Sequence, residues 1–239
     1  YPQADNIKNV IKDLARSKNA PMYEADKNSI EKISSDITGQ RFKYLKRDVF
    51  DLPEIKINLL GDHQLLNSVT ALAALEIIKK KGFNISSESI MKGFSNCRFP
   101  GRFEVLNKNP LIILDGGHNI DGISSFTKTL REHFKDKITF FFGILKDKNP
   151  EEALKLILPL AKEIYTLTPF SPRALKAEEL AELIKKQANI KVIPLDNYED
   201  ILHVIKNAGK NEIMAFSGSL YMIGSVRTLL RNNGLADNL

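Results

Sequence analysis

A carboxylate, two glycines, an imidazole and an amide directly follow a short apolar run. The run is Leu111–Leu114, and the next five residues, 115–119, read DGGHN. Open α/β sheets bind their ligands where buried strands end, and glycines let a ligand approach the backbone. Asp115 could accept hydrogen bonds from a ribose, and His118 could contact a phosphate or a reacting acyl group. The pattern predicts a site for a phosphorylated ligand at this strand end.

Each of these residues also has a plain structural interpretation. Asp115 could form a local Asx turn, and His118 could be a structural histidine. Asn119 could simply cap the helix expected after it. The spacing alone leaves both interpretations open.

An arginine-bearing turn precedes the cluster. Residues 98–102 read RFPGR, and the Pro-Gly pair is typical of a turn. A guanidinium can bind phosphate through two parallel hydrogen bonds, so Arg102 is a candidate phosphate ligand. The alternative is a rigid interdomain linker whose arginines pair with nearby acids.

A second cluster, GDHQLLN at residues 61–67, lies between an expected strand and an expected helix. An Asn amide both donates and accepts hydrogen bonds, which suits the edge of an adenine, so Asn67 is a candidate ligand. His63 is interpreted as a capping or core residue. The spacing does not fit HExxH, so no zinc site is predicted.

Two further loops follow strongly apolar runs. The first reads LKDK and contains Lys146 and Asp147; the second reads SGS and contains Ser217 and Ser219. Both are expected at the same edge as Asp115, where backbone amides could hold an anion. Ordinary connecting turns are the alternative for both. Neither GxxxxGK[ST] nor GxGxxG after a strand occurs in the sequence.

Strand and helix patterns alternate from residue 102 onward, which favours a mostly parallel α/β sheet covered on both faces. Residues 96–100 resemble a linker, so we expect two domains, 1–97 and 98–239. In the second we expect strands at 103–106, 111–114, 138–144, 163–167, 191–194 and 212–217, and helices at 120–133, 150–160, 176–187, 198–207 and 220–232. In the first we expect helices at 5–18, 65–81 and 86–93, and short strands at 21–25, 40–46 and 56–60.

Composition restricts the function classes. The 239 residues are 43% hydrophobic and 27% charged, which is typical of a globular protein. The net charge of +6 is spread along helix faces, so no nucleic-acid partner is expected. No apolar run approaches the roughly 20 residues that span a bilayer, and no membrane association is expected. With Cys97 as the only cysteine, we expect a reducing, cytoplasmic location. We also expect a monomer.

Taken together, the motifs resemble the folylpolyglutamate synthase/dihydrofolate synthase family, a branch of the Mur-type ATP-dependent amide ligases. The matching stretches are LLGDHQLLNSVTALAAL (59–75), RFPGRFEVL (98–106), LIILDGGHNIDG (111–122), FFGILKDKN (141–149) and FSGSLYMIGSVR (216–227). The resemblance implies the C-terminal half of such an enzyme. Its fold would be a Rossmann-like C-terminal domain (98–239), preceded by the C-terminal remnant of a central P-loop ATPase domain (1–97).

The resemblance also implies a reaction. ATP would phosphorylate a carboxylate of folate or dihydropteroate, and the amino group of L-glutamate would attack the acyl phosphate. Asn67 would contact adenine, Arg102 the ATP phosphates, and Asp115 the ribose. His118 would be catalytic, near the phosphates. The loops with Lys146, Asp147, Ser217 and Ser219 would adjoin the glutamate or the domain interface.

Part of the family's machinery is expected outside the chain. Its P-loop and the residues that bind Mg²⁺ should lie upstream of Tyr1, so the chain alone is expected to be an inactive part of the ligase. A Mur-type ligase acting on another carboxylate, such as a cell-wall precursor, is an alternative, although Gly116 favours the folate branch. A non-catalytic nucleotide-binding module is another. Whether the parent makes dihydrofolate, extends polyglutamates or does both stays open.

Overall fold

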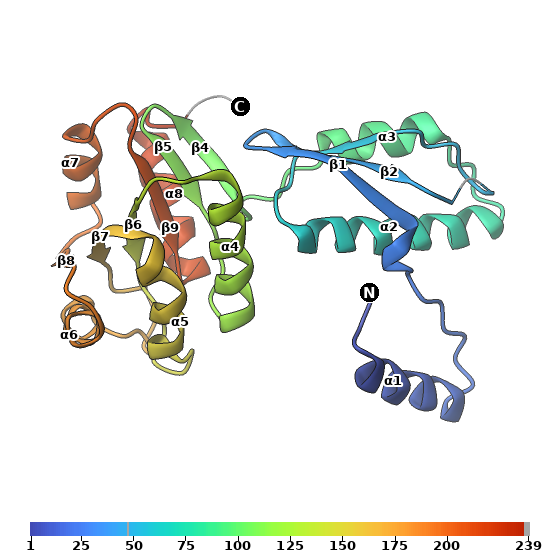
Figure 1. The fold of residues 1–239 in the computed structure, drawn as a ribbon, viewed down its shortest axis with the longest axis horizontal. Helices are drawn as coiled ribbons and strands as arrows, with labels where there is room; N and C mark the ends of the chain where they lie inside the picture. The colour runs from blue at the N-terminus through green and yellow to red at the C-terminus, as the bar shows by residue number, and fades with distance from the viewer. Residues whose placement is uncertain (47, 237–239) are drawn as a thin grey trace. The chain divides into compact units, whose positions relative to one another are not determined.

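The computed structural model describes residues 1–46 and 48–236, which form two compact units (Figure 1). Unit 1 covers Tyr1–Arg98, and unit 2 begins at Phe99. Each unit has its own sheet and its own apolar core.

Unit 1 is built around a small antiparallel sheet with the strand order β1–β2–β3. Its elements are α1 (Asp5–Ser17), the 3-10 turn η1 (Lys27–Ser29), β1 (Ile30–Asp36), β2 (Gly39–Tyr44), β3 (Ile55–Ile57), α2 (Asp62–Lys80) and α3 (Ser87–Asn96). Side chains alternate along β2: Phe42 and Tyr44 are buried, whereas Arg41 and Lys43 are exposed. The buried set joins apolar residues of α2 and α3 in one core, as strand periodicity requires.

Two expectations for unit 1 are wrong. The strand predicted over 21–25 is absent from the structure, and β1 (Ile30–Asp36) was not predicted. Five of the seven residues of β1 are exposed, so its sequence lacks the apolar alternation that signals a strand. Pairing with β2 decides its conformation instead. The other predicted strands and helices of this unit are confirmed, with shifted ends.

Unit 2 contains a six-stranded sheet in the order β4–β5–β9–β6–β7–β8. Its elements are β4 (Glu104–Lys108), β5 (Leu111–Leu114), α4 (Ile120–His133), β6 (Ile138–Phe142), α5 (Pro150–Ile157), the 3-10 turn η2 (Leu158–Leu160), β7 (Ala161–Thr166), α6 (Ala177–Gln187), β8 (Lys191–Pro194), α7 (Asp200–Lys206), β9 (Ile213–Ser217) and α8 (Leu220–Asn232). Only β4 among these described strands runs antiparallel to its neighbour. The predicted α/β class with a mostly parallel sheet is confirmed.

Helices cover both faces of this sheet. Residues of α7 and α8 join one core with alternate residues of the strands, such as Ile112, Phe141 and Phe216. Helices α4, α5 and α6 follow one another on the opposite face (Figure 1). All five residues of β6 are buried, because a strand packed on both faces exposes no side chain to water. This double cover leaves the strand ends as the accessible part of the sheet.

Candidate functional site

The C-terminal ends of β5, β9 and β6 lie side by side and form the rim of unit 2. The carbonyl of Gly117 accepts hydrogen bonds from the Gly218 amide (2.9 Å) and from the Ser217 hydroxyl (3.3 Å). Gly218 has φ +110°, and a Cβ there would overlap the carbonyl of Gly143. Glycine is therefore required where these loops pass each other. Three loops from distant parts of the sequence meet at one edge, where the sequence analysis expected them.

Asp115 is buried at this rim, and both of its carboxylate oxygens have backbone partners. Oδ1 accepts from the Gly117 amide (2.8 Å), and Oδ2 accepts from the Phe103 amide (2.9 Å). Burial raises the pKa of Asp115 to about 6, although the two amides and the nearby charge of Arg102 act to lower it. The Asx-turn interpretation is thus confirmed. Each oxygen retains a second lone pair, so an additional hydroxyl donor is compatible with these bonds.

Arg102 lies against the loop that begins at Asp115. The residues on either side of it, Gly101 (φ +70°) and Phe103 (φ +43°), both have left-handed backbone conformations. The carbonyl of Gly101 accepts from the Gly116 amide (2.7 Å). A Cβ on Gly116 would lie 2.9 Å from Nη1 of Arg102, so the absence of a side chain at Gly116 makes room for the guanidinium. The structure brings Arg102 and Asp115 together, as the sequence predicted.

A second carboxylate holds the same turn, and the sequence analysis missed it. Oε2 of Glu104 accepts from the Gly101 amide (2.8 Å), and both Glu104 oxygens accept from Nε of Arg227 (2.9 and 3.0 Å). Both side chains are mostly buried. Arg227 is the last residue of the stretch SGSLYMIGSVR, and its place in that motif is the one feature of the sequence that could have indicated its role. Glu104 and Asp115 together fix the amides on either side of Arg102.

The His118 ring is oriented by its own loop. Nδ1 lies 3.0 Å from the carbonyl of Gly116. A carbonyl can only accept, so Nδ1 carries the proton in this contact and Nε2 of the neutral ring keeps its lone pair. The half-buried ring is free to act through Nε2. Asn119 accepts from the Gly122 amide (2.8 Å) and caps α4, which confirms the capping interpretation.

The loop after β6 carries a network of ion pairs. Asp147 pairs with Arg173 (3.0 Å), and Lys146 pairs with Glu179 (3.4 Å). All four side chains are about half exposed, so these pairs contribute little to stability. Lys146 and Asp147 can therefore exchange these protein partners for a charged ligand.

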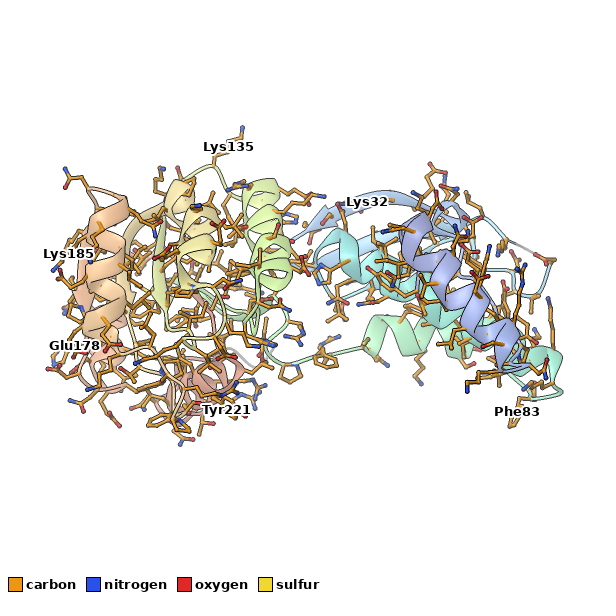
Figure 2. All side chains as sticks on the ribbon, turned by 90° about the horizontal axis from the view of Figure 1, so that it is seen from below. Lys32, Phe83, Lys135, Glu178, Lys185 and Tyr221 are labelled. Carbon is orange, nitrogen blue, oxygen red and sulfur yellow. The ribbon has the colours of Figure 1, made fainter. Side chains whose placement is uncertain are left out.

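Ser217 and Ser219 are both buried, unlike the lysine loop. The Ser217 hydroxyl bonds to Gly117, and that of Ser219 accepts from the Met222 amide (3.5 Å) and caps α8. Their hydroxyls serve the fold, and the next two side chains, Leu220 and Tyr221, are exposed (Tyr221 is labelled in Figure 2).

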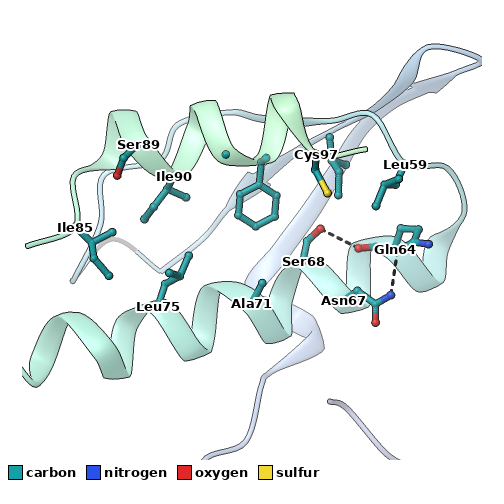
Figure 3. A pocket seen from close by; sticks show the side chains of 13 residues that line it. Leu59, Gln64, Asn67, Ser68, Ala71, Leu75, Ile85, Ser89, Ile90 and Cys97 are labelled. Carbon is teal, nitrogen blue, oxygen red and sulfur yellow. Dashed lines mark hydrogen bonds between the residues drawn. The ribbon is translucent and has the colours of Figure 1, made fainter. Parts of the chain in front are cut away.

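Asn67 lies in unit 1, on the exposed side of α2. Its Nδ2 donates to Oε1 of Gln64 (3.0 Å), which leaves Oδ1 and one N–H available. Asn67 points away from α3, whereas Ser68 and Ala71 point toward it (Figure 3). A cavity of about 410 Å³ is lined by residues of α2 and α3 together with Ile57 and Leu59. Its lining is mostly apolar and includes Leu59, Ala71, Leu75, Ile85, Ile90 and Phe94. Asn67 is itself one of the residues that line the cavity, and its Oδ1 and one N–H are not used by Gln64.

The described residues do not fit a magnesium site of their own. In residues 1–46 and 48–236, no group of three or more His, Cys, Asp and Glu is placed to hold a metal ion. None of the helices there is long and apolar enough to cross a membrane.

The rim belongs to a recognisable domain. A family profile described as Mur ligase, glutamate ligase domain matches residues 101–220. The chain belongs to the Mur ligase family. The matched segment contains Arg102, Asp115, His118 and the loop after β6. Unit 2 of this Mur ligase chain therefore has its candidate site within the family's domain.

Similar proteins carry more specific names. A crystal structure of folylpolyglutamate synthase from Thermotoga maritima has a TM-score of 0.77 and 30% identity, and the match covers 97% of this chain and 53% of that one. The dihydrofolate synthase/folylpolyglutamate synthase of Bacillus subtilis is 29% identical over 199 residues, which are 81% of this chain and 45% of that protein. A folylpolyglutamate synthase of Mycobacterium tuberculosis, complexed with ADP and AMPPCP, shares the fold (TM-score 0.79, 23% identity, 95% of this chain and 53% of that one).

These relatives confirm the predicted branch of the Mur ligases, folylpolyglutamate synthase/dihydrofolate synthase. The chain spans about half the length of the curated relatives it matches. The activity of a whole enzyme is therefore a question for the protein that contains this chain.

Proposed function

We propose that the protein containing this chain is an ATP-dependent ligase that joins L-glutamate to folate or dihydropteroate through an acyl phosphate. One observation carries the proposal: in a Mur ligase domain, Arg102 is held at the strand-end rim beside Asp115 and His118. On this proposal unit 2 corresponds to the glutamate ligase domain expected over residues 98–239. Unit 1 corresponds to the C-terminal part of the central ATPase domain expected over residues 1–97.

Each rim residue has a role that suits its contacts. The guanidinium of Arg102 binds the ATP phosphates and offsets the negative charge that grows during transfer. Asp115 accepts from a ribose hydroxyl through a remaining lone pair. Nε2 of His118 accepts a proton from the glutamate amine as it attacks the acyl phosphate. The Gly116 carbonyl holds the ring in the tautomer that this step needs.

Other residues complete the binding of substrates. Asn67 offers one acceptor and one donor to the edge of adenine, a pairing that an amide makes well. Lys146 and Asp147, with the segment of Ser217 and Ser219, adjoin the glutamate. Magnesium would neutralise phosphate charge in such a transfer. We expect its ligands outside the described residues, and we therefore expect no ligation by this chain alone.

The test is glutamylation by the full-length protein. With ATP, Mg²⁺ and L-glutamate, mass spectrometry should detect folate or dihydropteroate extended by one glutamyl residue. Arg102→Ala should lower kcat/KM for ATP by about 100-fold to 1,000-fold, as loss of a charge-stabilising donor does. Arg231→Ala is the matched control, because Arg231 is exposed at the far end of α8.

Other outcomes would refute the proposal. Amide formation only on a different acid, such as a cell-wall precursor, would assign another Mur ligase activity. Nucleotide binding without amide formation on any of these acids would assign a binding module. Equal use of ATP by the Arg102 variant and the Arg231 variant would remove the proposed role of Arg102. Sedimentation of the same protein would test the expected monomer.

A further inference from the structure

Phe103 has a backbone conformation that bulky residues rarely adopt. Its φ is +43°, in the left-handed region. In the described part of the chain, the other residues besides glycine with positive φ are Asn19 and Asn149, and asparagine adopts this conformation readily. For phenylalanine the conformation is unfavourable, because its Cβ lies too close to a carbonyl oxygen. The structure around Phe103 must therefore hold it there.

The ring of Phe103 is anchored on helix α4. Phe103 is only 7% exposed, and its ring packs edge-on against that of Phe126, with 5.6 Å between the ring centroids. The ring centroid of His133, about two turns further along α4, lies 6.5 Å away. Burial of an aromatic ring and its edge-on contact stabilise the folded state, and they offset the cost of the left-handed backbone.

The left-handed conformation lets Phe103 contact two parts of unit 2 at once. Its amide donates to Oδ2 of Asp115 (2.9 Å), while its ring packs on α4. Because φ is the rotation about the bond between the amide nitrogen and Cα, it fixes the direction of the amide relative to the side chain. A fixed ring therefore also fixes the amide that binds Asp115.

Arg102 directly precedes Phe103, so the same turn decides where its guanidinium lies. On the other side of Arg102, the Gly101 carbonyl accepts from the Gly116 amide (2.7 Å). Gly101 has φ +70°, which a glycine adopts without the help of a side chain. Of the two left-handed residues beside Arg102, only Phe103 depends on an anchor.

A second phenylalanine of the RFPGRF stretch contacts Arg102 from the solvent side. The ring centroid of Phe99 lies 5.7 Å from Cζ of Arg102, but Phe99 is 59% exposed. A cation–π contact in water contributes less than a buried one. The buried ring of Phe103 is therefore the stronger support of the turn.

We propose that Phe103 is a positioning residue for the candidate site. Its ring, packed on α4, holds the turn that aims Arg102 and places the amide that binds Asp115. The proposal deepens the proposed function, because Arg102 and Asp115 are the residues that we assign to ATP. A side chain that fills the space beside Phe126 should serve this role, and a small side chain should not.

Hydrogen exchange in the 239-residue chain tests the anchor without any substrate. In Phe103→Ala, the amide of residue 103 should exchange on the order of 10-fold to 100-fold faster relative to the amides of β9. Alanine keeps the Cβ that disfavours the left-handed conformation and lacks the ring that compensates for it. Phe103→Leu should restore most of the protection. Phe103→Gly should give an intermediate rate, because glycine tolerates the conformation but has no anchor.

Leu130→Ala is the matched control. Leu130 is fully buried on the same helix, so its loss lowers stability without changing the turn at Phe103. The variant should lower the Tm of the chain. The exchange of the residue-103 amide relative to β9 should stay unchanged.

Kinetics of the full-length protein separate positioning from stability. Phe103→Ala should raise KM for ATP and lower kcat/KM for ATP on the order of 10-fold to 100-fold, because a displaced guanidinium binds the phosphates less well. A loss of folded enzyme alone lowers kcat and leaves KM for ATP unchanged, which is the result expected for Leu130→Ala. Phe103→Leu should rescue most of the change in KM.

Three results would overturn the proposal. In the first, Phe103→Ala and Leu130→Ala change the amide exchange and KM for ATP alike, so that the ring serves stability only. In the second, Phe103→Gly protects the residue-103 amide as well as phenylalanine does, so that the turn needs no anchor. In the third, Phe99→Ala raises KM for ATP as much as Phe103→Ala, so that the exposed ring positions Arg102. A protein without ligase activity would refute the proposed function, and the exchange result would still decide whether Phe103 anchors the turn.

Discussion

The helices of the two units differ in what they bury. Each helix described in unit 2 buries at least two side chains, whereas α1 in unit 1 buries none. An apolar face that stays in water gains nothing from the hydrophobic effect. Unit 2 covers its sheet with helices that all bury side chains, whereas α1 adds no buried side chain to unit 1.

The sharpest test of this difference is one substitution made in both units. Leu230 in the last turns of α8 is fully buried, and Leu14 at the corresponding place in α1 is 59% exposed. Leu230→Ala should lower the free energy of unfolding of unit 2 by about 2–5 kcal/mol, because it leaves a cavity. Leu14→Ala should change that of unit 1 by less than about 0.5 kcal/mol. Urea unfolding of the 239-residue chain measures both, and similar losses at the two sites would contradict the comparison.

A second test uses the buried carboxylate of Asp115. Its pKa is raised to about 6 in the folded protein from 3.8, so the folded state binds a proton more tightly than the unfolded state. The stabilising effect of protonation is complete below about pH 4 and is lost as pH rises to about 6. Asp115→Asn should remove this part of the pH dependence, which by order of magnitude is about 3 kcal/mol.

The direct measurement for Asp115 is carbon NMR of its carboxyl group. A midpoint near pH 6 is expected, and a midpoint near 4 would mean that the rim is more hydrated than the structure indicates.

A third test compares two ion pairs. Glu104 and Arg227 in unit 2 are 18% and 24% exposed, and Glu104 also accepts from the Gly101 amide. Arg41 and Glu54 in unit 1 are 52% and 43% exposed. A double-mutant cycle to alanine should give a coupling of about 1–3 kcal/mol for the first pair and about 0–1 kcal/mol for the second.

We also expect the pair of Glu104 and Arg227 to affect the use of ATP. In the full-length enzyme, Glu104→Ala should raise KM for ATP more than it lowers kcat, because the turn that carries Arg102 loses its support. Rescue by Glu104→Gln, which can still accept from the Gly101 amide, should be partial. An unchanged KM would mean that Glu104 serves only stability.

The sequence predicted best where local pattern and tertiary structure agree. Residues 120–133 and 220–232 form helices with the predicted ends, because a capping side chain begins each one and its apolar stripe meets the sheet. Prediction failed where a partner decides the conformation. The edge strand β1 is mostly exposed and forms only through β2, and residues 21–25 lack any partner strand in the described part of the chain.

In the candidate site, too, features set by local sequence were predicted, and features set by tertiary contacts were not. Asp115 and Arg102 were predicted because their residue types and strand-end position are informative. The bond from the Gly117 amide fits the Asx turn that the sequence analysis considered. The bond from the Phe103 amide could not be predicted, because it depends on the left-handed turn around Arg102. Glu104 and Arg227 are 123 residues apart, so only the fold shows that they meet.

The smallest expected effect concerns two helical glycines. Gly224 in α8 and Gly93 in α3 are both exposed, and a Cβ on either would meet nothing within 4 Å. Alanine should stabilise each unit by about 0.5–1 kcal/mol, because glycine loses more backbone entropy in a helix. Thermal unfolding of the 239-residue chain should show both gains. A lower Tm for either variant would mean that the added methyl group meets a neighbouring side chain, contrary to the open space around both glycines.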